Sequence, residues 1–471
     1  MTQTLIADMF YVFFLIFLAY FLVLTAFYIF LAILGLIEGK KRFRESERED
    51  YPLVYLSTFA VPVSVIIPAH NEELWIRDSV LSVTNLNYPN FELIVVDDGS
   101  TDKTLQILTD TLKLKPAVKT YIKHYKNGQV HEILRSGKYP NVTVISKSQG
   151  LKKAGAVNSG LNIAKNDYIC VIDADTVLEP NALLKVMAHI AKDRDRIIGA
   201  GSGFGLANGL KMKDGRIIER NHSINPLVVY QNLEYIRSFI GNRIGWSKYN
   251  AMPNVAGGFG MWRRDVLYEL GGYSADYTCE DLEMTFRCHD YIAKNKEKDL
   301  KILMLPYYVS WTEGPSNITS LFSQRDRWQR VINETVSRYK YMIFNPKYGS
   351  FAFLTLPYFL FYELFGVYIE IISMAFVTIG WLCGILGIKT FLAFLALMIL
   401  SQIIVSLMSI LAFLRSQRQF TIYYMAYLVA LSFFEFILYR PIISAAKLYG
   451  TFNYFRKIRT FDQYTREKRA V

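Results

Sequence analysis

The sequence contains little cysteine, and its cysteines are widely spaced. The four are Cys170, Cys279, Cys288 and Cys383, and they include no C-x-x-C pair, which excludes the usual zinc-ribbon and thioredoxin-type motifs. In a cytoplasmic domain such thiols are expected to be reduced, and Cys170 lies in an apolar run that predicts a core position. Internal repeats and low-complexity tracts are also lacking, which excludes a solenoid of stacked repeats.

Charge is absent from one long stretch near the beginning. Residues 9–37 contain no charged side chain, and a run of that length exceeds the ~30 Å hydrocarbon core of a bilayer. A signal peptide would have an apolar region of only about 7–15 residues, with basic residues in front of it. Here Asp8 precedes the run and a basic cluster at 40–44 follows it. We therefore predict a retained transmembrane helix, with the N-terminus outside and the next domain in the cytoplasm.

Basic residues are in excess, yet they do not form the pattern expected of a nucleic-acid-binding protein. Lysine and arginine number 53 against 41 acidic residues, for a net charge of +12, but no single stripe combines them with interleaved aromatics. They concentrate beside apolar segments, at residues 40–44, 415–418 and 456–469. This placement favours membrane lipids over nucleic acid as partners.

Three further apolar segments predict a C-terminal membrane region over residues 351–449, followed by a basic tail over 450–471. The charged residues that interrupt them include Glu363, Glu370, Glu435 and Arg440. Such residues are costly in lipid, so they should line a polar path for a saccharide or pair with one another between helices. Three spans would place the basic tail outside, whereas its charge favours the cytoplasm. The last segment contains Pro441 and is therefore the candidate for a re-entrant or interfacial one.

Residues 40–316 alternate between predicted strands and helices. The segments "PVSVIIPAHN", "FELIVVDDGSTDKT", "NVTVIS" and "DYICVIDADT" are typical of buried strands, whereas "NEELWIRDSVLSVTNL" and "KKAGAVNSGLNIA" have helical spacing. Apolar strands that alternate with helices favour a parallel sheet covered on both faces. We predict an α/β domain with a mostly parallel, Rossmann-like sheet, inserted between transmembrane helices, with ligands at the carboxyl ends of its strands.

Two of these strands end in pairs of aspartates. Asp97 and Asp98 close one strand, and Asp173 and Asp175 form a D-x-D at the end of another. Neighbouring carboxylates repel each other unless a cation joins them, and Mg²⁺ or Mn²⁺ binds carboxylates together with phosphate oxygens. Lys153 is a candidate contact for a diphosphate. Each signal also occurs in solvated turns or on ordinary surfaces, so it is their joint occurrence that indicates a site.

The later segment "GGYSADYTCEDLEMTFR" adds an acidic pair after a glycine turn. Glu280 or Asp281 could act as a general base if it reaches the same cleft. Acidic residues are also favoured in the first turn of any helix, which is the alternative explanation.

These motifs together resemble a known family. "VSVIIPAHNE", "VVDDGSTD", "KAGAVNSG", "DAD", "CED" and "QRDRW" occur in the order found in family 2 glycosyltransferases, from about Pro62 to Tyr341. They look most like the membrane-embedded synthases of cellulose, chitin, hyaluronan and poly-N-acetylglucosamine. The resemblance implies a GT-A fold and an inverting, Mg²⁺- or Mn²⁺-dependent transfer from a cytosolic nucleotide-sugar, such as a UDP-sugar. The product would be a β-linked polysaccharide exported across the plasma membrane.

The resemblance also implies a role for each matching residue. Asp281 would be the catalytic base. The nucleotide-sugar would be bound by Asp97, Asp98, Lys153, Asp173 and Arg327, and the metal by Asp173 and Asp175. The acceptor would lie against Gly258, Glu280, Gln324 and Trp328. The chemistry agrees, because a divalent ion stabilises a diphosphate leaving group and inversion requires a base on a different element from the D-x-D.

The chain departs from the family pattern in two places. The usual Thr-Glu-Asp is Cys279-Glu280-Asp281, so the acidic position is kept while the cysteine could alter the loop or add thiol sensitivity. The stretch Leu112–Tyr139 is longer than usual and basic. It could be a lid or a partner site, but a solvated insertion is the expectation.

The motif "QRDRW" lies within residues 317–345, where apolar residues recur at helical spacing among many charges. A basic amphipathic helix beside apolar segments is typical of the membrane interface, and a surface helix packed on the domain is the alternative. Positions i, i+3 and i+4 share a helix face. Gln324, Arg327 and Trp328 should therefore project together, while Arg325 and Asp326 point elsewhere.

Two other functions are compatible with these features. A non-processive enzyme that adds one sugar to a lipid, like ceramide glucosyltransferases, carries the same Arg–Trp ending, so the acceptor could be a saccharide or a lipid. A non-catalytic nucleotide-sugar sensor or transport subunit is a further alternative, against which the complete acidic set argues. The motifs do not specify an export or regulatory partner.

Overall fold

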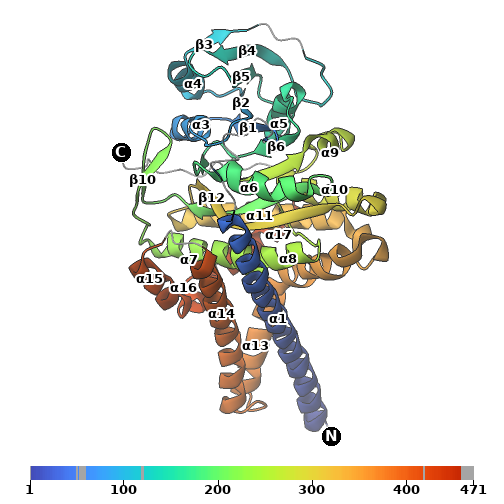
Figure 1. Cartoon of the computed structure of the whole chain (residues 1–471). Coiled ribbons are helices and arrows are strands. Elements are labelled where there is room, and N and C mark those ends of the chain that lie inside the picture. Colours follow the sequence, from blue (N-terminus) through green and yellow to red (C-terminus); the bar gives the residue numbers. More distant parts are fainter. Residues whose placement is uncertain (1, 49–50, 52–59, 118–120, 417–419, 458–471) are drawn as a thin grey trace.

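The computed structural model describes residues 2–48, 51, 60–117, 121–416 and 420–457 and has two parts (Figure 1). The polar middle of the chain forms a domain of helices packed on a large sheet, and apolar helices from both ends of the chain lie together on one side of it. The α/β class and the insertion of the domain between apolar helices are thus confirmed. Most of the predicted basic tail lies outside the described residues.

Ten strands form one sheet in the order β3-β4-β5-β2-β1-β6-β11-β8-β12-β7. Its parallel centre consists of the four expected strands, β1 (Val63–Ala69), β2 (Phe91–Asp98), β5 (Val142–Lys147) and β6 (Tyr168–Val171). Farther along the sheet β8 and β12 are also parallel, whereas the other flanking pairs are antiparallel. The flanking strands are β3 (Leu114–Pro116), β4 (Val130–Ser136), β7 (Val177–Leu178), β8 (Ile197–Leu206), β11 (Gly260–Arg263) and β12 (Lys301–Thr312), and β9 (Leu210–Lys213) and β10 (Arg216–Arg220) form a separate hairpin.

The central strands are apolar throughout because both faces of the sheet are covered. Along β1, Val63, Val65 and Ile67 belong to one buried cluster and Ile66 to the other. Cys170 is buried in the first of these clusters, as its apolar run predicts. Helices α3 (Ile76–Thr84), α4 (Thr104–Leu112) and α6 (Ala182–Ile190) contribute to the first cluster, and α5 (Lys152–Ile163), α9 (Arg264–Glu269) and α10 (Glu280–Lys294) to the second.

The basic stretch Leu112–Tyr139 is not simply a solvated insertion. It contains β3 and β4, which extend one edge of the sheet as an antiparallel pair beside β5. Tyr125 packs in the core at 5% exposure, and Asn162 of α5 bonds to its backbone N–H (2.9 Å). The expectation was wrong because an edge strand tolerates polar residues: His131, Glu132 and Arg135 of β4 remain exposed, while Ile133 and Leu134 are buried.

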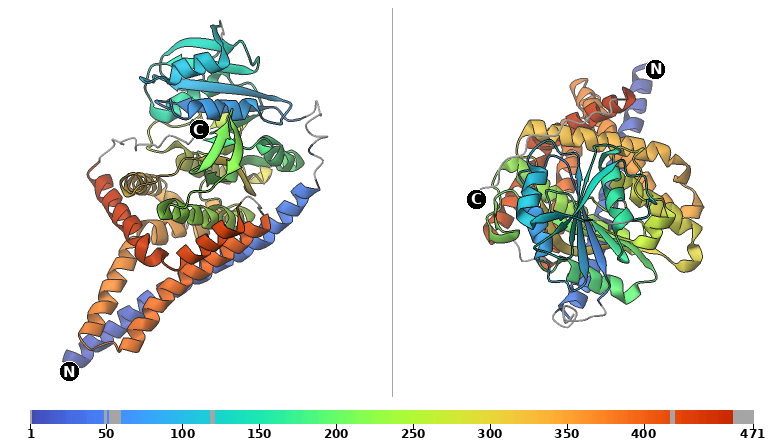
Figure 2. Two further views of the ribbon diagram at one scale, coloured as in Figure 1. Left: turned by 90° about the vertical axis from the view of Figure 1, so that its left-hand side faces the viewer. Right: turned by 90° about the horizontal axis from the view of Figure 1, so that it is seen from above.

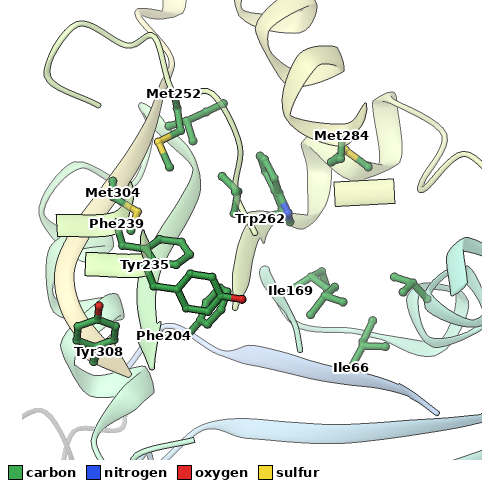
Figure 3. Packing of buried hydrophobic residues seen from close by; sticks show 14 of the residues in the cluster. Ile66, Ile169, Phe204, Tyr235, Phe239, Met252, Trp262, Met284, Met304 and Tyr308 are labelled. Carbon is green, nitrogen blue, oxygen red and sulfur yellow. The ribbon is translucent and has the colours of Figure 1, made fainter. Parts of the chain in front are cut away.

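A long continuous helix connects the domain to the apolar helices. It consists of α7 (Pro226–Tyr235), the π-helical segment η2 (Ile236–Arg243) and α8 (Ile244–Lys248). Phe204 of β8 packs against Tyr235 and Phe239, with ring centroids 5.1 and 4.5 Å apart (Figure 3). On its other sides η2 contacts α1 and α14.

Helix α1 (Thr2–Glu47) contains the predicted span 9–37 and continues into the domain. Its Gly35 lies so close to η2 that a Cβ atom there would overlap the carbonyl of Gly241. Farther along, Glu38 forms an ion pair with Lys248 of α8. The same helix therefore contributes apolar length for a membrane and a rigid support for the domain.

Helices α13 (Gly366–Leu382) and α14 (Ile388–Ser416) run beside α1, and the three project from the domain as a bundle (Figures 1 and 2). The beginning of α1 meets the turn between α13 and α14 at the far end, where the Tyr11 hydroxyl donates to the Ile385 carbonyl (3.2 Å). Helices α1 and α14 are each long and apolar enough to cross a membrane.

Two other apolar segments are bent. The segment Phe351–Leu364 meets α13 at 50°, and Ile422–Ser432 meets Glu435–Phe455 at 66°. The segments Ile422–Ser432 and Glu435–Phe455 lie against the domain rather than along the bundle (Figure 1). The first bent segment consists of η6 (Phe351–Thr355), α12 (Leu356–Tyr358) and η7 (Phe359–Leu364). The second consists of α15 (Ile422–Ser432), α16 (Glu435–Leu438) and α17 (Arg440–Phe455).

Helix α11 (Ile318–Arg338) carries the QRDRW motif. It begins at Asn317, whose side chain accepts a hydrogen bond from the Ser320 N–H (2.9 Å). Part of the apolar stripe that was expected to face a membrane interface, including Leu321 and Val336, is buried in protein, whereas Ile318 is 55% exposed. Helix α17 lies along α11 and, together with α10 and η7, covers this stripe.

Candidate active site

A cavity of about 1340 Å³ lies between the carboxyl ends of the central strands, α11 and the apolar helices. Every residue predicted for the site lines this cavity except Asp97. The lining residues of the predicted set are Asp98, Lys153, Asp173, Asp175, Gly258, Glu280, Asp281, Gln324, Arg327 and Trp328. Residues that are far apart in the sequence therefore meet in one space, as the joint occurrence of the motifs predicts.

The aspartates of the D-x-D lie in the turn that follows β6, rather than on the strand itself. The Lys153 ammonium, at the beginning of α5, is 2.5 Å from carboxylate oxygens of both Asp173 and Glu280. Burial by itself would lower the pKa of Lys153, but Asp173, Glu280 and Asp281 raise it well above its usual value. The lysine is therefore held as a cation at the centre of an acidic group.

The acidic pair fits a hard divalent ion that a phosphate helps to hold. Asp175 is 5% exposed, and its Oδ1 accepts a hydrogen bond from the Thr312 hydroxyl (3.1 Å). Within the described residues no group of three or more His, Cys, Asp or Glu side chains could hold a metal by itself. Mg²⁺ sites of this kind commonly use one or two carboxylates plus substrate phosphates and water. Asp173 and Asp175 fit that donor set.

The aspartates at the end of β2 differ in their surroundings. Asp98 forms an ion pair with Lys147, whose side chain is fully buried. Burial raises the pKa of Asp98, although Lys147 opposes this effect. Asp97 is buried outside the cavity, and burial raises its pKa despite hydrogen bonds to Ser100. Lys147 was not among the predicted site residues. The signal that could have identified it is the apolar run "VTVIS" directly before it, which places Lys147 at a strand end.

Asp281 lies at the beginning of α10, where the helix dipole favours a carboxylate. Its Oδ2 accepts the Gly257 N–H (2.8 Å), and its Oδ1 accepts the Cys279 thiol (2.8 Å). A Cβ atom placed on Gly257 would be 3.1 Å from the Lys153 ammonium, 3.4 Å from Asp281 Oδ2 and 3.5 Å from Asp173 Oδ2. The bare Gly257 backbone thus leaves room for these three groups to converge.

The QRDRW motif presents Gln324, Arg327 and Trp328 to the cavity, as the helical spacing predicts. Asp326 points away and bonds to Arg330 of its own helix (2.6 Å) and to Asn453 of α17 (3.0 Å). Arg325 was expected to point elsewhere, but it also lines the cavity.

The tertiary structure redirects Arg325. Its guanidinium lies 4.1 Å from the centre of the Trp328 ring and bonds to Glu234 of α7 (2.7 Å) and to Tyr439 (3.3 Å). These partners come from elements far away in the sequence, so helical spacing alone could not identify them.

The cavity continues from α11 between the apolar helices. Its lining there includes Thr25 and Tyr28 of α1 and Gln402 of α14. The membrane-region charges form ion pairs, and their partners are not all those expected. Glu370 pairs with Arg440 (2.7 Å), Glu363 with Lys447 (2.8 Å), and Glu435 with Arg237 of η2 (2.6 Å). These charges therefore pair between helices, which is one of the two alternatives, and most of them also line the cavity.

Comparisons with known proteins agree on one family. The model "Glycosyl transferase family 2" matches residues 64–271, and "Glycosyl transferase family group 2" matches residues 168–438, more than half of the chain. The second match extends beyond the domain into the C-terminal helices, as far as the end of α16.

Among curated relatives, the chain is 28% identical over 312 residues to a probable glycosyltransferase, YdaM, of Bacillus subtilis. It is 26% identical over 277 residues to a poly-beta-1,6-N-acetyl-D-glucosamine synthase of Staphylococcus epidermidis. The matches cover 64% and 59% of this chain and 63% and 56% of the two relatives. The chain therefore aligns with about three fifths of the length of these proteins.

Among solved structures, a similar fold occurs in the mannosyltransferase PcManGT from Pyrobaculum calidifontis, which was determined in complex with GDP-Man and Mn²⁺. The TM-score is 0.51 at 16% identity, and the match covers 88% of this chain and 99% of that one.

Proposed function

The chain belongs to glycosyl transferase family group 2, and we propose that it is a membrane-integrated, metal-dependent, inverting glycosyltransferase that elongates a β-linked polysaccharide. The donor would be a nucleotide-sugar, most simply a UDP-sugar, and the product would be passed across the plasma membrane. The observation that carries the proposal is the single cavity, which runs from Asp98 and Lys153 past Asp281 and Trp328 to the space between the apolar helices.

The donor half of the cavity would bind the nucleotide diphosphate. Lys153 and Arg327 offer cationic groups to its oxygens. Asp98, which is paired with the buried Lys147, would contact the nucleotide base. Asp173 and Asp175 would hold Mg²⁺ or Mn²⁺, which supplies charge stabilisation to the departing diphosphate when bound. The PcManGT complex with GDP-Man and Mn²⁺ supports this assignment by analogy of fold.

Asp281 would act as the general base. The acceptor hydroxyl oxygen attacks the anomeric carbon while the bond to the diphosphate breaks, and the hydroxyl proton moves to the Asp281 carboxylate. The hydrogen bonds from Gly257 and Cys279 hold this carboxylate still. Because Asp281 belongs to α10 and the D-x-D follows β6, base and leaving group can lie on opposite faces of the sugar, as inversion requires.

The acceptor half would receive the growing chain. Trp328 offers a ring for stacking on a sugar, and Gln324, Glu280 and the backbone at Gly258 surround the same space. Beyond them the paired charges of α13 and α17 give the cavity a polar lining that suits a hydrated saccharide. The similarity to a poly-beta-1,6-N-acetyl-D-glucosamine synthase supports a polymer over a single lipid-linked sugar.

We also infer a membrane topology. If α1, α13 and α14 each cross the membrane, an outward N-terminus leaves the domain and α15–α17 on the cytoplasmic side, which suits the basic C-terminal tail. The 66° bend before Glu435–Phe455 supports an interfacial position for the last apolar segment.

A donor panel tests the proposal. Purified protein in lipid nanodiscs would be given Mg²⁺ or Mn²⁺ and a series of radiolabelled nucleotide-sugars, and both product length and donor hydrolysis would be measured. A polymer from one donor is the expected result. One sugar per lipid would support the lipid-transfer alternative, and no incorporation or hydrolysis from any donor would support the sensor alternative.

A further inference from the structure

Lysines and arginines line the cavity along its whole length, and most of them are neutralised by a carboxylate. The ion pairs are Lys153 with Asp173 and Glu280, Arg237 with Glu435, Arg325 with Glu234, Arg440 with Glu370 and Lys447 with Glu363. The cavity-lining cations without an ion pair to any described residue are Lys152, Arg243 and Arg327. Lys152 and Arg327 belong to the donor motifs, so Arg243 is the exception on the acceptor side.

Arg243 is held in place by the end of η2. The segment is wedged between α1 and α14 and is π-helical, a form that is rare and often marks functional sites. The Arg243 guanidinium lies 4.4 Å from the centre of the Phe239 ring, which packs in turn on Phe204 of the sheet. The side chain is therefore built into the wall of the cavity and is not a mobile surface arginine.

The carboxylates that act on Arg243 are already engaged by other groups. Asp281 and Glu363 are the acidic groups whose charges influence it. Asp281 accepts hydrogen bonds from Gly257 and Cys279, and Glu363 accepts them from Lys447 and Tyr358. The Nη1 atom of Arg243 is buried and has no hydrogen-bond partner among the described residues. Arg243 as a whole is half-buried, but a buried N–H group without a partner is costly to retain unless a ligand accepts its hydrogen bond.

We propose that Arg243 binds an anionic substituent, a carboxylate or a phosphate, on the acceptor saccharide, close to the hydroxyl that Asp281 deprotonates. The inference rests on the proposed function and adds to it a class of acceptor: an acidic glycan. Guanidinium groups bind carboxylates and phosphates through paired hydrogen bonds, which gives both attraction and orientation. Burial lowers the pKa of Arg243 to about 10, so the side chain remains charged at neutral pH.

The surroundings favour an acidic sugar over a lipid headgroup as the source of the anion. Arg243 lines the same cavity as Asp281 of the domain and as Tyr358 and Glu363 near the apolar helices, and the charges of these groups act on it. Trp246 and Tyr235 also line the cavity, with their rings buried against Phe27 and Phe204. The anion would thus be bound beside the catalytic base, at the level of the reacting sugar.

A matched pair of small ligands tests the proposal. Phenyl β-D-glucoside and phenyl β-D-glucuronide differ only at C6, where the latter has a carboxylate. Their binding to the full chain in phosphatidylcholine nanodiscs would be measured by isothermal titration calorimetry. Wild-type protein should prefer the glucuronide by about tenfold, since hydrogen bonds to charged groups are the stronger kind. The variant Arg243→Gln should lose the preference, and Arg243→Lys should keep part of it.

Controls separate this site from general electrostatics and from the proposed function. Arg77→Gln, an exposed residue outside the cavity, should leave the preference unchanged. If the preference survives in Arg243→Gln, or if both ligands weaken equally in that variant and in Arg243→Lys, the proposal is wrong. If anionic lipid added to the nanodiscs displaces the glucuronide, the site belongs to a lipid headgroup, which also overturns it. Donor hydrolysis with water as acceptor, measured on the same samples, tests the proposed function independently.

Discussion

The two halves of the cavity are built in different ways. In the donor half, most predicted side chains are carried by short continuous motifs at a strand end or a helix beginning, as for Asp98, Asp173 and Lys153, whereas Arg327 comes from the middle of α11. In the acceptor half, only Gln324 and Trp328 share a motif, and the rest of the wall comes from helices far apart in the sequence. Donor chemistry is therefore encoded locally, whereas acceptor specificity depends on how distant helices pack.

The electrostatics of the halves differ as well. The donor half gathers several carboxylates around Lys153, a donor set that the proposed metal ion would complete. In the acceptor half most charges are neutralised in pairs, such as Glu370 with Arg440, and Arg243 stands outside such a pair. Substitutions in the donor half should thus impair donor hydrolysis and sugar transfer together. Those in the acceptor half should impair transfer alone.

The largest effect is expected where the halves meet. Asp281→Asn removes the base and should lower transfer by about 10²- to 10⁴-fold, while donor affinity, measured by calorimetry, stays near the wild-type value. Asp290→Asn, farther along the same helix and paired with Lys294 (2.6 Å), is the matched control. Full activity in Asp281→Asn would show that another group accepts the proton.

In the donor half, Lys147→Met should destabilise the domain. It leaves the Asp98 carboxylate buried without its ion pair, which costs about 3–5 kcal/mol in comparable buried sites. The thermal unfolding temperature should fall, and donor hydrolysis and transfer should fall together. The double variant Asp98→Asn with Lys147→Met should recover much of the lost stability. An unchanged unfolding temperature in the single variant would contradict the buried pair.

In the acceptor half, Trp328→Ala should raise the acceptor KM by about tenfold, a typical loss for one stacked ring, with donor hydrolysis unchanged. Trp328→Phe should retain part of the affinity. Phe322→Ala is the control, because Phe322 lies on the same helix but contacts Tyr449 outside the cavity. Equal losses of hydrolysis and transfer in Trp328→Ala would remove the distinction between the halves.

The smallest effect is expected at Cys279. Its thiol donates to Asp281, but a thiol is a weak donor, so Cys279→Ala should lower transfer only about threefold and Cys279→Thr should restore it. Burial, with the nearby acidic groups, raises the pKa of Cys279 well above its usual value. Iodoacetamide should therefore modify the exposed Cys383 faster, as mass spectrometry of peptides can measure. Faster labelling of Cys279 would contradict this account.

The elements that the sequence predicted best are those with strong local patterns. The four central strands, the apolar helix over residues 9–37 and the family itself were all confirmed. The edge strands β3 and β4 were missed because an exposed edge tolerates the polar composition of a loop. The interfacial position of α11 stays a prediction, since a stripe packed on protein and one that faces a membrane have the same spacing.

The sequence by itself determined the fold class and the donor motifs, because strand periodicity and the residues at strand ends are set by neighbours in the chain. Only the tertiary structure decided which charges neutralise each other. Glu435 pairs with Arg237 and Arg325 turns toward Glu234, because helices distant in the chain bring these groups within hydrogen-bond distance. The same packing left Arg243 without such a partner in the cavity that Asp281 also lines, a difference that no local pattern in the sequence contains.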